Sequence, residues 1–169
     1  MQAKTPEQSK TILTDMVLPG ETNPLNNLFG GELLARMDRA ASISAQRHSS
    51  HIVVTASVNH VAFSKAVPLG SVVTVEAKVS RAFKTSMEVF IDVWIEDRIS
   101  GERTKVNEGI YTFVAVDAIG KPIIVPEVLP ETELEKQRFD AALRRKQLSL
   151  LLAGKMKPSE ASELKAFFK

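Results

Sequence analysis

Hydrophobic and polar residues alternate with a period of two along much of the chain. This is the pattern of β-strands that turn one face towards a core. The stretches with this pattern cover residues 11–18, 52–60, 73–80, 87–96 and 104–116. Turn formers such as Pro68, Gly70, Gly101 and Gly120 separate them. Because no further helical pattern alternates with these strands, we predict an antiparallel sheet and the fold class α+β.

One helix is predicted between the first and second strands, over residues 31–48. When this segment is wound at about 100° per residue, one side is polar and the opposite side is apolar or small. The polar side carries Glu32, Arg36, Arg39, Gln46 and Arg47, and the opposite side carries Leu34, Met37, Ala41, Ala45 and His48. The Ala and Ser residues of positions 40–45 favour close approach to a sheet. The sequence therefore predicts a single helix packed on the antiparallel sheet.

The last part of the chain lacks the alternating pattern. Residues 126–130 contain two prolines that make a stiff exit from the last strand. The acidic residues that follow are typical of a helix N-terminus, and a break at 157–158 precedes a short final helix at 159–168. We expect a domain of residues 1–125 and a helical extension of residues 126–169. Such an extension covers part of its own domain or a neighbouring subunit.

The composition is that of an ordinary globular domain. The chain has 169 residues, with 22 basic and 20 acidic residues and no cysteine. This balance argues against nucleic acid as a partner, because nucleic-acid-binding domains concentrate basic charge on one face. The lack of cysteine excludes disulfides, thiolate metal sites and a cysteine nucleophile. The polar N-terminus is unlike a signal peptide, and the apolar runs are shorter than the ~20 residues of a membrane span. We therefore expect a cytoplasmic protein without a membrane partner.

Asp38 is the most informative polar residue of the predicted helix. It lies about 120° from the middle of the polar side, close to Leu34. One interpretation is an aspartate at the edge of the polar side that pairs with a nearby arginine. However, Arg36 and Arg39 point towards the other side, and Glu32 is spaced to pair with Arg36. A carboxylate beside an apolar face without a local cation is typical of a functional site.

The loop before the helix ends in Gly30 and Gly31. Two glycines permit close approach of a ligand, and the free amides of a helix N-terminus favour negative charge. A simple tight turn explains the two glycines equally well. Asn23, Asn26 and Asn27 of the same loop are common turn residues, and the pattern alone does not favour a catalytic role for them.

The histidines do not form a metal-binding pattern. His48 and His51 are close in sequence, but no third ligand lies near them, so we predict no metal site. His60 is interpreted as a strand residue. The chain also has no serine-nucleophile elbow, phosphate-binding loop or dinucleotide motif.

A hairpin at residues 81–87 is a candidate phosphate-binding segment. Arg81 and Lys84 stand close to the hydroxyls of Thr85 and Ser86. Cations beside hydroxyl groups bind phosphates. Solvated charges at the end of a hairpin explain the same residues.

Four segments of the chain together resemble a known family. The loop NPLNNLFGG runs into GELLARMDRAA, and HIVVTASVNHVAF, KTSMEVFIDVW and YTFVAVDAIGKPIIVPEVLPETELEKQRF follow in order. These segments resemble the acyl-CoA thioesterases of the hotdog superfamily. The similar branch contains the short bacterial acyl-CoA hydrolases and the duplicated cytosolic hydrolases of animals. The resemblance extends from about Thr11 to Phe139.

The resemblance implies a hotdog fold, in which a curved antiparallel sheet wraps around one central helix. It also implies paired subunits with active sites at the dimer interface, assembled as a trimer of dimers. The expected substrate is a fatty acyl-CoA, which is hydrolysed to a free fatty acid and coenzyme A. No metal or redox cofactor is implied, and coenzyme A takes part only as a piece of substrate and product.

The resemblance also implies roles for residues of the loop and the helix. Asp38 falls on the family's catalytic acid, which activates water as a general base or attacks the thioester directly. The thioester carbonyl would accept a hydrogen bond from the amide of Gly31, with Gly30 beside it. Asn27 matches an asparagine implicated in some members and would orient the water or the carbonyl.

The substrate-binding residues that the resemblance implies lie on the strands. Thr55 matches a pocket threonine on the second strand. Lys84, Thr85 and Ser86 fall in a segment that resembles the coenzyme A contact region, and Arg81 stands next to it. These residues are expected to bind the substrate without taking part in the chemistry.

Three other functions are consistent with parts of the pattern. A hotdog dehydratase would need a catalytic histidine with an acidic partner, and no histidine precedes the helix. A non-catalytic acyl-CoA-binding module of a lipid regulator predicts a DNA-binding segment, for which too few residues precede the first strand. A purely structural assembly module gives no role to Asp38. The acyl-CoA hydrolase is the function that uses most of the residues described above.

Overall fold

Five strands form one antiparallel sheet in the order β1-β3-β4-β5-β2. The structure is a computed structural model that describes residues 1–168. Its strands are β1 (Thr11–Met16), β2 (Ile52–Phe63), β3 (Val72–Ala82), β4 (Ser86–Glu96) and β5 (Arg103–Val116). The predicted α+β class and antiparallel sheet are therefore confirmed, with strand ends close to the expected ones.

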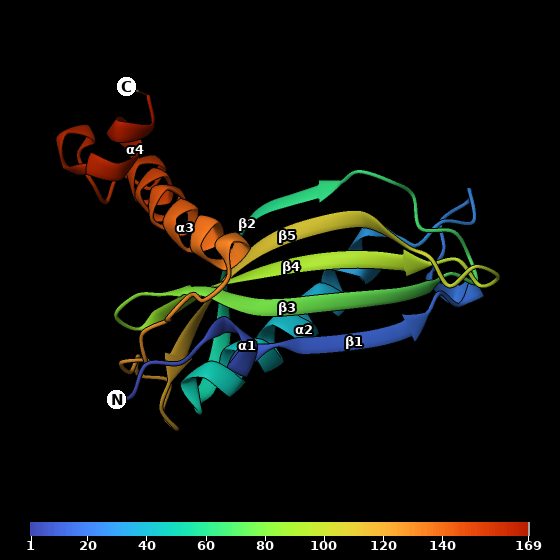
Figure 1. Cartoon of the computed structure of the whole chain (residues 1–169), viewed down its shortest axis with the longest axis horizontal. Helices are drawn as coiled ribbons and strands as arrows, with labels where there is room; N and C mark the ends of the chain where they lie inside the picture. Colours follow the sequence, from blue (N-terminus) through green and yellow to red (C-terminus); the bar gives the residue numbers. More distant parts are fainter. Residues whose placement is uncertain (169) are drawn as a thin grey trace.

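The long helix α2 (Gly30–Ser49) packs on one face of this sheet, and Figure 1 shows the strands running across it. Ala40, Ala41 and Ala45 have no exposed surface, and their small side chains let the helix approach the strands closely. Gly109 of β5 completes this fit, because a Cβ atom there would overlap the terminal methyl group of Met37. The predicted helix is confirmed, one residue longer at each end.

Arg36 of α2 does not lie on a solvated side of the helix, as its place in the pattern predicted. The residue is 5% exposed, and its Nη2 lies 2.7 Å from Oε2 of Glu21. The expected pairing with Glu32 is therefore wrong. The 3-10 turn η1 (Pro19–Glu21) follows β1 and folds over this side of the helix. A tertiary contact thus replaces the local i, i+4 pair.

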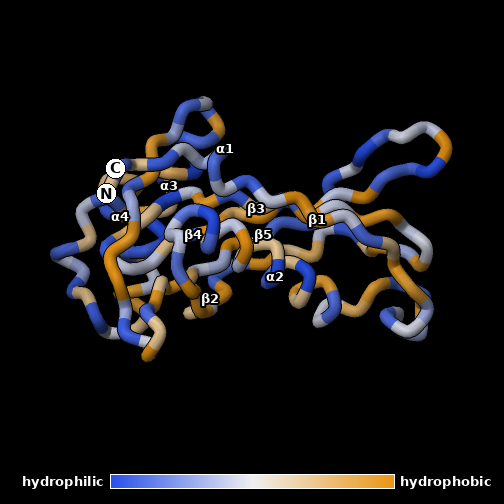
Figure 2. The backbone as a smooth tube through the Cα atoms, turned by 90° about the horizontal axis from the view of Figure 1, so that it is seen from below, coloured by the Kyte–Doolittle hydropathy of each residue, from blue (hydrophilic) through white to orange (hydrophobic). Residues whose placement is uncertain are grey.

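Helix α3 (Glu133–Leu152) begins at the N-cap Thr132, whose hydroxyl accepts from the amide of Glu135 at 3.2 Å. It crosses the sheet on the face opposite α2 (Figures 1 and 2). Arg145 binds both carboxylate oxygens of Glu88, at 2.7 and 2.9 Å, and Arg138 binds Asp92 at 2.9 Å. The polar side of β4 is therefore buried under a helix of the same chain.

The chain ends in two short helical segments, η2 (Pro158–Glu160) and α4 (Ser162–Phe167). The predicted final helix is thus split, and Lys169 of the predicted extension lies outside the described residues. No helix of residues 1–168 combines the length and the apolar character needed to cross a bilayer. The division into residues 1–125 and 126–169 stays a prediction.

The C-terminal end of α2 is bound by two segments far from it in sequence, around Lys4 and Pro126. The Lys4 ammonium donates to the carbonyls of Arg47 at 3.0 Å and His48 at 2.7 Å, which satisfies orphan carbonyls of the last helical turn. The Nε2 of His48 donates to the carbonyl of Pro126 at 2.8 Å. The short helix α1 (Pro6–Ser9), which follows Lys4 in the chain, also packs against α2. The helix is thus fixed at its C-terminal end, remote from Gly30 and Gly31 at its N-terminus.

Candidate functional site

Asp38 and Thr55 lie side by side, although they come from different elements. Asp38 projects from α2 and is half-buried, while Thr55 lies on the exposed strand β2. The Thr55 hydroxyl donates to Oδ1 of Asp38 at 2.8 Å. No ion pair within residues 1–168 involves Asp38. One carboxylate oxygen is therefore oriented by a hydroxyl, and the group is not neutralised by a neighbouring cation.

Tyr111 of β5 lies close enough to Asp38 to be affected by its charge. Its ring is buried, and its hydroxyl donates to the carbonyl of Leu34 at 3.2 Å. Burial, together with the negative charge of Asp38, raises the pKa of Tyr111 to about 12. The phenol thus stays protonated at neutral pH. Tyr111 was not among the predicted site residues, although it is the one tyrosine of the sequence and lies on the buried side of β5.

The N-terminus of α2 presents backbone amides without a side-chain cap. Phe29 is the N-cap residue, and no side chain of the described chain caps the helix there. Gly31 is exposed, and a Cβ atom at this position would have no neighbour within 4 Å. At Gly30 the same atom would lie 3.3 Å from the ring of Phe63. The entrance is open at Gly31 and close-packed at Gly30, and its amides can stabilise a developing negative charge.

Gly31 and Asp38 lie on the same side of α2 but about two turns apart, which is about 10 Å along the helix axis. The structure brings Asp38 together with Thr55, and it does not bring Asp38 together with Gly31. The predicted catalytic groups are thus separated along one face of α2, with the Gly31 amide at its N-terminus and Asp38 about two turns further on.

Asn23 organises the loop that leads into α2. Its side-chain Oδ1 accepts from the amides of Leu25 at 2.9 Å and Asn27 at 3.2 Å. Its own amide donates to the carbonyl of Asn27 at 2.8 Å. Asn27, the predicted catalytic asparagine, is also paired through its backbone to Pro68. Because Oδ1 of Asn23 is held by the loop, the orientation of its Nδ2 donor is fixed.

The predicted phosphate-binding residues lie around the hairpin between β3 and β4. Lys84 is exposed, Thr85 is half-buried and Ser86 is buried at the start of β4. Arg81 stands apart from them, because its Nη1 donates to the carbonyl of Phe139 at 2.9 Å and its guanidinium lies over that ring. The structure therefore leaves Lys84 available to a ligand and engages Arg81 with α3.

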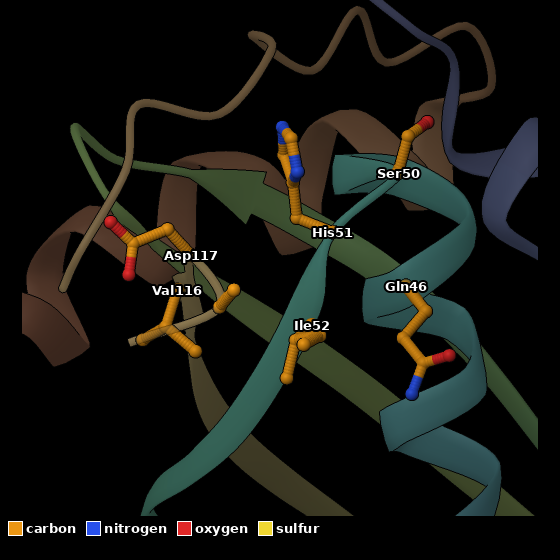
Figure 3. A pocket seen from close by; sticks show the side chains of 7 residues that line it. Gln46, Ser50, His51, Ile52, Val116 and Asp117 are labelled. Carbon is orange, nitrogen blue, oxygen red and sulfur yellow. The ribbon is translucent and has the colours of Figure 1, made fainter. Parts of the chain in front are cut away.

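A pocket of about 460 Å³ lies where α2 ends and β2 begins. Figure 3 shows Ser50, His51 and Asp117 around it, residue types that occur together in hydrolase triads. The Ser50 side chain points away from His51 in this view. The Asp117 carboxylate caps its own turn, accepting from the amides of Ile119 at 3.0 Å and Lys121 at 2.8 Å. These three residues are thus not arranged as a triad.

The described part of the chain contains no group of three or more His, Cys, Asp or Glu side chains placed to hold a metal ion. The absence of a required cofactor remains a prediction. The chemistry available at the α2 face consists of a carboxylate, a hydroxyl and backbone amides.

Comparison with known proteins defines the class. The family model described as the thioesterase superfamily matches residues 25–102. This segment runs from the loop before α2 to the turn between β4 and β5. The long helix α2, packed on one face of the five-stranded antiparallel sheet, thus belongs to a hotdog fold of the thioesterase superfamily.

Individual relatives narrow the class to one family. YkhA of Bacillus subtilis (strain 168), an uncharacterized acyl-CoA thioester hydrolase, is 42% identical over 147 residues, which cover 84% of this chain and 86% of YkhA. A solved hexameric acyl-CoA thioesterase shares 40% identity with a TM-score of 0.87, covering 90% of this chain and 98% of the other. The acyl-CoA hydrolase of Staphylococcus aureus, solved with butyryl coenzyme A and coenzyme A, shares 35% identity with a TM-score of 0.84, covering 97% and 99%. The chain belongs to the family of acyl-CoA thioester hydrolases.

Proposed function

We propose that this protein hydrolyses the thioester of a fatty acyl-CoA, with Asp38 as the catalytic carboxylate. The observation that carries the proposal is the Thr55–Asp38 hydrogen bond, which orients a carboxylate without a cationic partner on the central helix. The family membership supports acyl-CoA as the substrate, because YkhA and the solved relatives are acyl-CoA hydrolases. The products are a free fatty acid and coenzyme A.

Two chains complete one active site in this proposal. The separation of about 10 Å between Gly31 and Asp38 along α2 favours a site in which one chain supplies Gly31 and its partner supplies Asp38. Strand β2 supports such pairing, since it is an unpaired edge that exposes Ile52, Val54 and Val58. Long edges of this kind pair with another chain. The dimer would assemble further into a trimer of dimers, in line with the hexameric relative.

The reaction has two routes that share the same groups. In the first, Asp38 takes a proton from water as the water oxygen attacks the thioester carbon. The carbonyl oxygen becomes an oxyanion at the amide of the partner subunit's Gly31, the C–S bond breaks, and the thiolate of coenzyme A takes the proton. In the second, Asp38 attacks the carbon itself, the C–S bond breaks and the thiolate of coenzyme A leaves. Water then hydrolyses the resulting mixed anhydride, which releases the fatty acid and regenerates Asp38, and a proton from this water ends on the thiolate. Both routes need an ionised carboxylate.

Asn23, rather than Asn27, is the loop asparagine with the better support. The S. aureus hydrolase has been solved with single alanine substitutions of an asparagine, an aspartate and a threonine. The spacing of its aspartate and threonine equals that of Asp38 and Thr55. Its asparagine precedes the aspartate by the distance that separates Asn23 from Asp38. In this chain the Nδ2 of Asn23 would donate to the thioester carbonyl or to the attacking water, next to Gly31.

Coenzyme A would bind along the β3–β4 hairpin. Lys84 supplies an exposed cation for a phosphate, and Thr85 and Ser86 supply hydroxyls beside it. Arg81, held by Phe139, contributes charge from the side of the site. A location in the cytoplasm, expected from the lack of cysteine, stays part of the proposal.

Release of thiol from a panel of acyl-CoAs of increasing chain length tests this function. The wild-type chain is expected to hydrolyse them, and Asp38→Asn is expected to lower kcat by roughly 10²–10⁴ without changing the melting temperature. A catalytically silent wild-type chain that still binds acyl-CoA would identify a binding module instead. An Asp38→Asn variant with full activity per folded protein would overturn the mechanism.

A further inference from the structure

The loop of residues 21–29 is closed at its base, and its far side is also paired with residues 67–69. The amide of Leu28 donates to the carbonyl of Val67 at 2.8 Å, and the amide of Leu69 donates to the carbonyl of Asn26 at 2.8 Å. The amide of Phe29 donates to the carbonyl of Glu21 at 2.9 Å, which joins the two ends of the loop. Inside the loop, Asn23 accepts from two amides through its side chain. Because Asn23 is only two residues from Glu21, the position of its side chain depends in part on what fixes the base of the loop.

Glu21 is fixed through its carboxylate as well as its backbone. Oε2 accepts from Nη2 of Arg36 at 2.7 Å and from the amide of Leu18 at 2.9 Å. The hydrogen bond from the Leu18 amide contributes most, and the one from Arg36 comes next, to holding the pKa of Glu21 below its ordinary value. Nη2 of Arg36 also donates to the carbonyl of Met16 at 3.2 Å. One ion pair thus joins the end of β1, the base of the loop and the middle of α2.

Arg36 depends on Glu21 as its counter-charge. Its guanidinium is almost fully buried, and its Nη1 has no hydrogen-bond partner within the described residues. The next acidic group, Asp15, is exposed and lies 3.9 Å away. A buried ion that loses its partner is far more costly than a broken surface pair. The pair therefore holds the loop more tightly than a solvated salt bridge could.

We propose that Glu21 and Arg36 are positioning residues, which set the loop asparagine Asn23 against the amides at the N-terminus of α2. Arg36 is on the same rigid helix as Gly31, so the pair fixes the loop relative to the helix entrance. A shift of about 1 Å at a reacting group can cost about a hundredfold in rate. This inference rests on the thioesterase function proposed above. Neither residue needs to touch the substrate.

The test combines kinetics with hydrogen exchange on the full-length protein. Arg36→Met should lower kcat by roughly tenfold while KM stays within about twofold, because only the alignment of the loop changes. In an Asn23→Ala background the same substitution should cost less than about twofold, since its effect passes through that residue. Arg39→Met, which removes an exposed arginine from the next turn of α2, is the matched control and should leave kcat unchanged.

Hydrogen exchange reports the anchoring without any substrate. The amide of Phe29 should exchange at least about tenfold faster in Arg36→Met, while the amide of Tyr111 in the central sheet stays protected. If Arg36→Met does not fold, Glu21→Gln removes the same ion pair, keeps an acceptor for Leu18, and enters the same kinetic and exchange measurements. Unchanged protection of Phe29, or rate losses that simply multiply with Asn23→Ala, would overturn the proposal. A wild-type chain without thioesterase activity would instead refute the proposed function, and the exchange data would still decide the anchoring.

Discussion

Thr55 holds one oxygen of the Asp38 carboxylate through a 2.8 Å hydrogen bond, and the other oxygen accepts no hydrogen bond from residues 1–168. The donor comes from an edge strand and the acceptor from the central helix. The orientation of the carboxylate thus depends on how β2 packs beside α2. A hydroxyl is suited to this task, because it orients the charge without neutralising it.

Replacement of Thr55 tests this orientation. Thr55→Val keeps the shape of the side chain but removes the donor, and we expect kcat to fall by roughly tenfold or more, since a hydrogen bond to a charged group is worth about 1.5–3 kcal/mol. Thr55→Ser keeps the hydroxyl and should retain most of the activity. Steady-state kinetics with one acyl-CoA at saturating concentration measures both. Equal activity of the valine and serine variants would show that the hydroxyl has no part in the reaction.

Lys84 should contribute to coenzyme A binding and not to the chemistry. Lys84→Ala is expected to raise KM by severalfold with little change in kcat, and added salt should mimic this effect because exposed phosphate contacts are screened. Lys121→Ala removes an exposed lysine from a different turn and serves as the control. If KM of Lys84→Ala equals that of the wild type, the hairpin charge is only solvated.

The fold was predictable because the period-two pattern and the single helix pattern both reflect burial against one core. Asp38 could also be found from its place on the helix. Thr55 became a candidate only through the family resemblance, since an exposed threonine on a strand has no distinctive pattern. The partner of Asp38 is set by the packing of β2, which no local sequence window describes.

The burial of charged residues was the part that sequence reasoning could not supply. The polar positions of β4, such as Glu88 and Asp92, show which face is polar but not that α3 covers that face. Arg36 was assigned to solvent and to Glu32 because local spacing favours that pair. Its actual partner, Glu21, is brought near by the turn after β1. In both cases a distant segment decides the environment.

His48 should make the stability of the protein depend on pH. Burial lowers the pKa of this imidazole below its ordinary value of 6.5, and its Nε2 donates to the carbonyl of Pro126. The unfolded chain therefore takes up a proton that the folded chain resists. Stability from this group is complete above about pH 6.5 and falls below it, by at most about 1.4 kcal/mol per pH unit.

Melting temperatures of variants at about pH 7.5 and about pH 5.5 isolate this contribution. His48→Gln keeps a donor for the carbonyl of Pro126 and cannot titrate, so its melting temperature should fall less on acidification than that of the wild type. His51→Gln, at an exposed position, should behave as the wild type does. An identical acid response of His48→Gln and the wild type would mean that other groups govern the pH dependence.

The separation of Gly31 from Asp38 along α2 predicts complementation between two inactive variants. Asp38→Asn lacks the carboxylate and Asn23→Ala lacks the loop donor, so each should form a folded but nearly inactive assembly. In a mixed dimer with a two-fold axis, one site combines both defects. The other site combines the intact loop of one chain with the intact Asp38 of its partner.

Mixing the two variants in equal amounts, by co-expression or by refolding together, should therefore restore about a quarter of the wild-type activity per chain, because half of the random dimers are mixed and each has one intact site of two. The same variants purified separately and mixed without subunit exchange should stay inactive, which controls for residual activity. Light scattering on the active sample should show an assembly of at least two chains. Failure of the co-assembled variants to regain activity, or full activity in a monomeric wild-type sample, would place the complete site within one chain and contradict the shared-site mechanism.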